Sequence, residues 1–178
     1  PHPMFPGNLV GAFGAVSKAV IISLEKAGVV KPEISGKDKR SLGDGNKRSP
    51  ACFSTSNHWE ITVEGKKLAG SAQRRLSGAF LQHGSILLDW DPELAHSLFR
   101  YSSESEQAQG LKSLILGTST LKEVLSIKPE WREVAHCFVE GFQNTFPGYW
   151  QPETLNSLET ELVKEYLEEN EQVSFYVR

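Results

Sequence analysis

The chain has 178 residues, of which 39% are hydrophobic and 10% aromatic, which is enough apolar content for one ordinary core. Its 19 Lys and Arg residues are outnumbered by 22 Asp and Glu residues, and a formal charge of -3 argues against nucleic acid as a partner. No apolar run approaches the roughly 18 to 20 residues that span a bilayer. We therefore expect no membrane attachment and a cytoplasmic location.

The two cysteines, Cys52 and Cys137, are far apart, and neither belongs to a CxxC or Cys/His cluster. This spacing argues against a metal site and a disulfide framework, and it favours free thiols in a reducing compartment. The sequence starts at Pro1 and its only methionine is Met4, which suggests a fragment or a processed chain. We expect a single domain over 1–178.

The first predicted element is a helix. Apolar residues recur at helical spacing from Leu9 to Ala27, with Asn8 as a plausible cap and Gly28 as a plausible stop. Residues 31–58 are mostly polar, with six basic and three acidic side chains and no helical or strand period. They predict a long loop of the kind that is either functional or disordered.

Residues 59–73 predict a β-hairpin with a two-residue turn at Glu64-Gly65. If Val63 pairs with Lys66, then Leu68 lies opposite Ile61 on the core face and Lys67 lies on the other face. The face bearing Lys67 would continue as Ala69, Ser71 and Gln73. Small side chains beside one lysine would leave room for a ligand.

A further strand is predicted over 79–90, in which the polar residues 82–85 interrupt a buried apolar run. The remaining chain predicts helices over about 92–100, 119–126, 130–146 and 155–169. The domain would therefore have helix, loop and sheet motifs over 8–90 and a mainly helical part over 91–178.

Three residues are candidates for chemistry. Cys52 lies in the long loop near Lys47 and Arg48, and nearby cations favour the nucleophilic thiolate, although a cysteine that merely packs is about equally consistent with its position. For Cys137, beside the apolar stripe of a helix, we expect only packing. Lys67 could be a solvated lysine or a ligand contact, and His83 could be a general base or a hydrogen-bonded polar residue in a strand.

Residues 59–75, which read WEITVEGKKLAGSAQRR, and 78–87, which read GAFLQHGSIL, together resemble the biotin/lipoate protein ligase catalytic family. Within it the chain looks most like cysteine-dependent octanoyltransferases, because Pro50-Ala51-Cys52-Phe53 stands where they carry their nucleophile. The resemblance implies an α/β (α+β) fold of the class II synthetase and biotin ligase type, with a mixed sheet flanked by helices.

The same resemblance implies the roles of individual residues. Cys52 would be the nucleophile, and Lys67 would hold the acyl carbonyl. The substrate-binding residues would be Gly70, Ser71, Ala72, Gln73, His83, Gly84 and Ser85. No metal and no cofactor is implied.

The implied reaction moves an octanoyl or lipoyl group from acyl carrier protein, through a Cys52 thioester, to a lysine of a lipoyl domain or of the glycine cleavage H protein. The basic loop would suit an acidic carrier protein. Two alternatives stay open. An ATP-dependent lipoate ligase, with ATP and Mg, would keep Lys67 without needing Cys52, and a non-catalytic accessory subunit would keep the pocket without turnover.

One departure from the family stands out. Its Gly-rich arginine motif, of the type Arg-Arg-x-Thr-Gly-Gly-Arg, has no counterpart in the 178 residues. We therefore expect an N-terminally incomplete catalytic domain, which a separate chain would complete by supplying the missing segment. On that expectation, transfer by this chain alone would be poor and would rise when the segment is restored.

Overall fold

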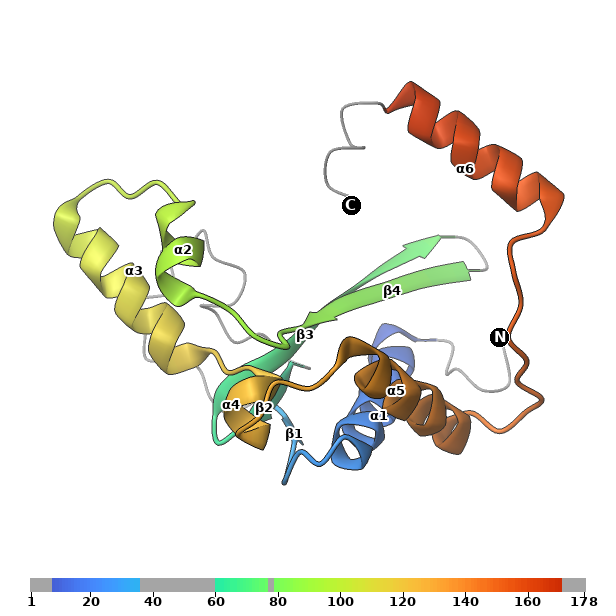
Figure 1. The fold of residues 1–178 in the computed structure, drawn as a ribbon, viewed down its shortest axis with the longest axis horizontal. Helices are drawn as coiled ribbons and strands as arrows, with labels where there is room; N and C mark the ends of the chain where they lie inside the picture. The colour runs from blue at the N-terminus through green and yellow to red at the C-terminus, as the bar shows by residue number, and fades with distance from the viewer. Residues whose placement is uncertain (1–7, 36–59, 77–78, 171–178) are drawn as a thin grey trace. The chain divides into compact units, whose positions relative to one another are not determined.

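The computed structural model describes residues 8–35, 60–76 and 79–170. The chain divides into two compact units, Pro1–Pro147 and Gly148–Arg178. The first unit contains a sheet with helices, and the second contains helix α6 (Ser157–Glu169), as Figure 1 labels them. The expected combination of a sheet with flanking helices is confirmed. The expected single domain with parts 8–90 and 91–178 stays a prediction.

Helix α1 (Leu9–Lys26) is confirmed where the sequence predicts it. The side chain of Asn8 caps it by accepting a hydrogen bond from the Gly11 amide at 2.7 Å. At the other end Gly28 has a φ of +94°, the left-handed conformation that ends helices and favours glycine. The cap and the stop are local signals, so the sequence alone locates both ends.

The described sheet has the strand order β1-β2-β3-β4, and every neighbouring pair is antiparallel. Its strands are β1 (Glu33–Ile34), β2 (Ile61–Val63), β3 (Lys66–Leu76) and β4 (Ala79–Ile86). Besides these strand pairings, Lys67 and Thr118 form an isolated β-bridge, which is parallel. Strand β1 lies inside the stretch predicted as loop, so that prediction is wrong at Glu33–Ile34. Residues 36–58 lie outside the described residues.

The hairpin of β2 and β3 has the predicted turn but a different register beyond it. Val63 pairs with Lys66 and Thr62 with Lys67, as predicted, whereas Ile61 pairs with Ala69 instead of Leu68. One residue, Leu68, is therefore extra on β3 and forms a β-bulge. Leu68 is fully buried in the core, and burying this side chain is a physical reason for the irregular register.

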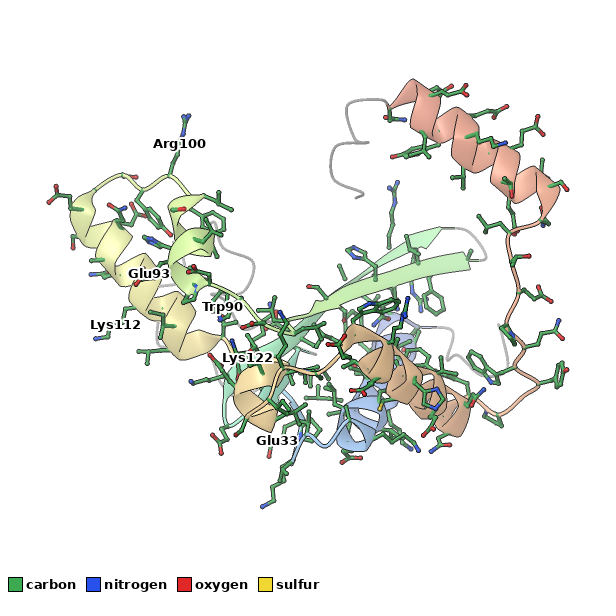
Figure 2. The ribbon with its side chains drawn as sticks, in the orientation of Figure 1. Glu33, Trp90, Glu93, Arg100, Lys112 and Lys122 are labelled. Carbon is green, nitrogen blue, oxygen red and sulfur yellow. The ribbon has the colours of Figure 1, made fainter. Side chains whose placement is uncertain are left out.

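Strand β4 is more open than predicted. Leu81 is 65% exposed, and His83, Gly84 and Ser85 are exposed as well, so the expectation of a polar break inside a buried strand is wrong. Beyond Ile86 the chain stays close to α4 (Leu121–Leu125), because the Leu121 amide donates to the Leu87 carbonyl at 2.8 Å. Figure 2 shows Lys122 of α4 near Trp90, and Lys122 pairs with Asp89 at 3.0 Å.

The core joins α1, the sheet, α4 and α5 (Trp131–Thr145) through buried apolar side chains. These side chains are Leu24, Val29, Ile61, Val63, Leu68, Ala69, Leu121 and Val134. Helices α1 and α5 lie side by side (Figure 1). The predicted helices over 119–126 and 130–146 are confirmed as α4 and α5. No helix among the described residues combines the length and apolar character needed to cross a bilayer.

Helix α2 (Pro92–Ser97) confirms the helix predicted there, but helix α3 (Glu104–Gly117) was missed. The sequence signal for the start of α3 was its N-cap residue, Ser103, whose hydroxyl accepts a hydrogen bond from the Glu106 amide at 3.2 Å. Helices α2 and α3 meet at buried His96, whose Nε2 lies 2.8 Å from the Gln107 carbonyl oxygen. In the second unit, α6 confirms the predicted acidic helix and starts at a capping box formed by Asn156 and Glu159.

Candidate functional site

A cavity of about 180 Å³ lies between the sheet and the two helices α1 and α5. Its apolar wall comes from both helices and the sheet, and its polar wall comes from β3 and β4. The lining residues are Val16, Ser17, Val20, Ile61, Ala69, Gly70, Ser71, Gln82, His83, Gly84, Ser85, Ile86, Phe138 and Phe142. The volume is below the roughly 300 to 1,000 Å³ of pockets for drug-sized ligands. It suits a slender apolar group.

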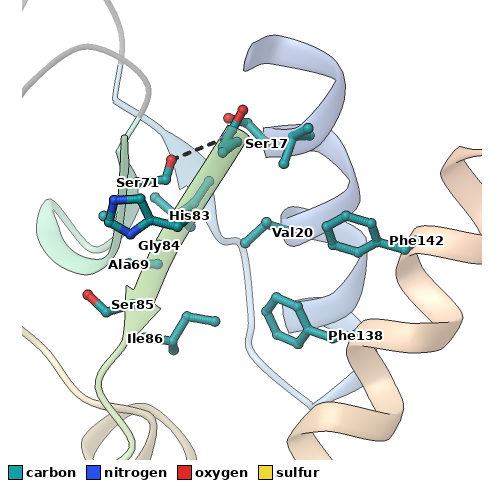
Figure 3. A pocket seen from close by; sticks show the side chains of 14 residues that line it. Ser17, Val20, Ala69, Ser71, His83, Gly84, Ser85, Ile86, Phe138 and Phe142 are labelled. Atoms are coloured by element: carbon teal, nitrogen blue, oxygen red, sulfur yellow. Dashed lines mark hydrogen bonds between the residues drawn. The ribbon is translucent and has the colours of Figure 1, made fainter. Parts of the chain in front are cut away.

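Figure 3 shows how the cavity walls face each other. Phe138 and Phe142 of α5 and Val20 of α1 lie on one side, and Ile86 of β4 points toward them. His83 lies on the other side of the strand. Sequence reasoning did not predict the contribution of α1 and α5, because periodicity locates a helix but does not say which stretch of sheet it covers.

Five of the predicted substrate-binding residues line this cavity, namely Gly70, Ser71, His83, Gly84 and Ser85. Gln73 does not line it, but its amide donates to the Gln82 side chain at 2.8 Å, and Gln82 in turn contacts the Ser71 hydroxyl at 3.4 Å. Ala72 and Lys67 are likewise absent from the lining. The predicted residues therefore divide into a group at the cavity and a group beside it.

Lys67 lies beside Gly70, which is one of the residues that line the cavity. A Cβ added to Gly70 would lie 2.9 Å from the Lys67 Cε and 3.1 Å from its Nζ. The lysine therefore fills the space that a side chain at position 70 would take. In a regular strand, residues 67 and 70 would point to opposite faces, and the bulge at Leu68 removes that difference.

Strand register gives the remaining members of the face that bears the Lys67 ammonium. Gly70 pairs with Ser85 and Ala72 pairs with His83, and residues paired directly across antiparallel strands share a face. Lys67 therefore shares its face with Gly70, Ala72, His83 and Ser85. The prediction that this face continues as Ala69, Ser71 and Gln73 is wrong, because the bulge shifts the alternation by one residue.

The ammonium of Lys67 forms a buried ion pair with Glu60. The Lys67 Nζ lies 2.6 Å from the Glu60 Oε1, and the two side chains are 7% and 6% exposed. Glu60 was not singled out from the sequence. A signal was present, because Glu60 and Thr62 alternate with the core residue Ile61, which directs Glu60 to the face of Lys67.

One of the two cysteines lies among the described residues. Cys52, the predicted nucleophile, lies outside the described residues. Cys137 on α5 is half-buried and has a free thiol, as expected for a residue beside an apolar stripe. Among residues 8–35, 60–76 and 79–170, no three His, Cys, Asp or Glu side chains gather in a way that could hold a metal ion.

Relatives with similar sequences are bacterial proteins named Octanoyltransferase LipM. The chain is 34% identical over 170 residues to the one from Geobacillus kaustophilus, covering 92% of this chain and 59% of that protein. It is 33% identical over 165 residues to the one from Brevibacillus brevis, covering 92% of this chain and 60% of that protein. The chain thus spans about three fifths of the length of the relatives it matches.

Solved structures with a similar fold are lipoate ligases. A bi-partite lipoate protein ligase from Thermoplasma acidophilum, studied with its E2 lipoyl domain, matches with a TM-score of 0.71 and 17% identity, over 92% of this chain and 56% of that one. Lipoate-protein ligase A bound with ATP matches with a TM-score of 0.67 and 17% identity, over 90% and 56%. At this identity the likeness shows the fold.

The family itself is shown by a match that covers most of the chain. Residues 3–143 match the family described as the lipoyl protein ligase A/B catalytic domain. The hairpin of β2 and β3, strand β4, helix α1 and all but the last two residues of α5 lie within this stretch. The chain therefore belongs to the lipoyl protein ligase A/B catalytic domain family.

Proposed function

We propose that this chain carries the acyl-transfer site of a cysteine-dependent octanoyltransferase, which moves an octanoyl group from acyl carrier protein to a lysine of a lipoyl domain. One observation carries the proposal. A buried lysine ammonium lies against Gly70, and Gly70 also lines a slender apolar cavity. Gly70 therefore connects the cavity to the sheet face that bears the cation. The sequence relatives named as octanoyltransferases add support.

In the first step, the Cys52 thiolate attacks the thioester carbonyl of the octanoyl carrier protein. A new carbon–sulfur bond forms, and negative charge develops on the carbonyl oxygen. The Lys67 ammonium stabilises this charge, because a fixed cation in a poorly hydrated site needs no reorganisation during the reaction. Collapse of the intermediate breaks the bond to the carrier sulfur, which leaves as a thiolate and takes a proton from water.

In the second step, the neutral amine of the acceptor lysine attacks the Cys52 thioester. An amide bond forms, the carbon–sulfur bond breaks, and the Cys52 thiolate is regenerated while the amine proton passes to solvent. A thioester donor is already activated, so this route requires no ATP. The proposed acceptor is a lysine of a lipoyl domain or of the glycine cleavage H protein.

The test is to incubate the 178-residue chain with octanoyl carrier protein and to measure its intact mass. We expect a gain of one octanoyl group, which peptide mapping assigns to Cys52 and which hydroxylamine removes as it does a thioester. Cys137→Ala is the matched control, because this variant keeps Cys52 and should still be acylated.

Acylation that persists in Cys52→Ala would overturn the covalent mechanism. Adding ATP with free octanoate or lipoate, in place of the carrier thioester, distinguishes the adenylating ligase. Modification of a lipoyl domain under those conditions, with none from the carrier thioester, would favour the ligase over the transferase.

A further inference from the structure

Lys67 is held in place by its backbone on two sides. Across the hairpin it pairs with Thr62, and on its other edge it bridges to Thr118. The Lys67 carbonyl accepts a hydrogen bond from the Ser119 amide at 2.8 Å, and Ser119 is itself buried. Because the Cα of Lys67 is fixed by these contacts, the position of its ammonium depends on the side-chain contacts alone.

Glu60 is the side-chain contact that carries the opposite charge. Its Oε1 lies 2.6 Å from the Lys67 Nζ, whereas its Oε2 is buried and has no hydrogen-bond partner among the described residues. A buried carboxylate is costly unless its charge is compensated. Within the described part of the chain, the contact of Glu60 Oε1 with the Lys67 ammonium provides this compensation.

The ion pair with Glu60 does not prevent the Lys67 ammonium from donating a hydrogen bond to an acyl carbonyl oxygen. An ammonium has three N–H donors, so the bond to Glu60 does not by itself exhaust them. Gly70 lets the ammonium lie where a Cβ would otherwise stand, 3.1 Å from the Nζ. The bulge brings the lysine to this face, Gly70 makes space for it there, and Glu60 compensates its charge.

We propose that Glu60 is a positioning residue, which holds the Lys67 ammonium beside Gly70 and compensates its charge in a poorly hydrated site. This inference rests on the proposed function for the role of Lys67 in catalysis, but the ion pair itself can be tested without any acyl substrate. Without the negative charge of Glu60, burial would favour the neutral amine of Lys67. A neutral amine would stabilise the developing oxyanion less.

Other titratable groups near Lys67 are few in the described part of the chain. His83 shares the sheet face through its pairing with Ala72, and Glu123 of α4 accepts a hydrogen bond from the Ser119 hydroxyl at 3.0 Å. Both groups are present in wild type and in Glu60→Gln alike. A change in Lys67 protonation after substitution of Glu60 can therefore be assigned to the lost charge.

The experiment is pH-dependent labelling of lysines with acetic anhydride, read at Lys66 and Lys67 separately by peptide fragmentation. Only neutral amines react, so the pH of half-maximal labelling rate reports protonation, and limited access lowers the rate without moving that midpoint. In Glu60→Gln we expect the Lys67 midpoint to fall, with Lys66 unchanged. Glu64→Gln, which removes the same charge from the exposed turn of the same hairpin, should leave both midpoints unchanged.

A Lys67 midpoint in folded Glu60→Gln that equals that of wild type would overturn the proposal. If this variant does not fold, the Lys67 labelling midpoint is measured in Glu60→Asp instead. It keeps the charge but withdraws it by one methylene, so a smaller downward shift supports the proposal and an unchanged midpoint contradicts it.

Octanoyl transfer gives a second reading. The ratio of the wild-type rate to the Glu60→Gln rate should increase with pH, because the variant loses the Lys67 charge at a lower pH. A ratio that is constant with pH would mean that Glu60 supports only the structure. Failure of the proposed octanoyl transfer would abolish this second reading and leave the labelling result intact, so the two failures are distinguishable.

Discussion

Gly141 of α5 lies directly against Ser23 of α1. A Cβ built at position 141 would lie 2.7 Å from the Ser23 amide nitrogen and 2.8 Å from its Cα, which are backbone atoms that cannot rotate away. The Ser23 hydroxyl is turned back to its own helix, where it donates to the Ala19 carbonyl at 2.8 Å. This close contact sets the separation of the two helices that wall the cavity.

Gly141→Ala should therefore reduce the free energy of unfolding by roughly 1–3 kcal/mol, a usual penalty for overpacking. Urea unfolding followed by circular dichroism measures it. The control is Gly117→Ala, because nothing lies within 4 Å of a Cβ built at that position and alanine favours the helix. Equal stability of the two variants would show that α1 and α5 can separate without penalty.

Gly70→Ala should slow octanoyl transfer by tenfold or more and leave the fold almost as stable. The added methyl would displace the flexible end of Lys67 instead of backbone, since the near atoms are its Cε and Nζ. The comparison of Gly70→Ala, Lys67→Ala and the double variant decides the cause. If Gly70 acts through Lys67, the double variant should be no slower than Lys67→Ala, and additive losses would contradict this.

Gly84→Ala is the contrasting substitution. Its Cβ would lie 2.6 Å from the Gly70 carbonyl oxygen, which belongs to the backbone of the neighbouring strand. We expect this variant to lose stability as well as transfer, because β3 and β4 must shift apart. Differential scanning calorimetry measures the stability loss, and a melting temperature equal to that of wild type would be inconsistent with the close approach.

Lys67→Ala should lower the rate of Cys52 acylation by about 100- to 1,000-fold, as does removal of an oxyanion donor. Lys66→Ala should have little effect, because Lys66 pairs with Val63 and points to the opposite face of β3. Single-turnover measurement with octanoyl carrier protein gives both rates. Similar losses in the two variants would mean that Lys67 does not act at the carbonyl.

Phe142→Ala should shift the preference among acyl donors toward longer chains. Phe142 lines the cavity, so its truncation leaves room for additional methylenes, each worth about 0.8 kcal/mol when buried. The ratio of decanoyl to octanoyl transfer should rise several-fold, measured in competition. Val139→Ala on the same helix is the control, since Val139 is 52% exposed and does not line the cavity. An unchanged ratio in Phe142→Ala would exclude this wall as the chain-length limit.

The ion pair between Lys26 of α1 and Glu140 of α5, at 2.7 Å, should make stability depend on pH. The hydrogen bond from Lys26, and then its charge, lower the pKa of Glu140 below its ordinary value of 4.5. A carboxyl with a lowered pKa in the folded state contributes stability above its ordinary pKa and loses it as the pH falls through the folded value. Both side chains are partly exposed, so the effect is small and salt-sensitive.

Lys26→Met should accordingly lower the urea midpoint at pH 7, with the difference from wild type disappearing toward pH 3. Lys18→Met removes the same charge from an exposed position of α1 and should show no such pH dependence. A Lys26→Met deficit that stays constant from pH 7 to pH 3 would mean that packing, and not charge, is lost.

The features that could be predicted correctly from the sequence are local. The cap at Asn8, the stop at Gly28 and the turn at Glu64-Gly65 each depend on a few neighbouring residues, so α1 and the hairpin turn are where the pattern predicts them. The signature around Lys67 likewise identified the family, because a motif is a property of consecutive residues.

The sheet face on which the Lys67 ammonium lies depends on tertiary packing and could not be predicted from the sequence. Alternation along β3 directs Lys67 to the face of Ala69, but burial of Leu68 in a core shared by distant helices inserts a bulge and moves the ammonium to Gly70. The partner at Glu60 and the backbone contact at Ser119 follow from the same packing. Side-chain alternation has a period of two, so one extra residue reverses it, and the energy that favours the extra residue comes from contacts that are remote in the sequence.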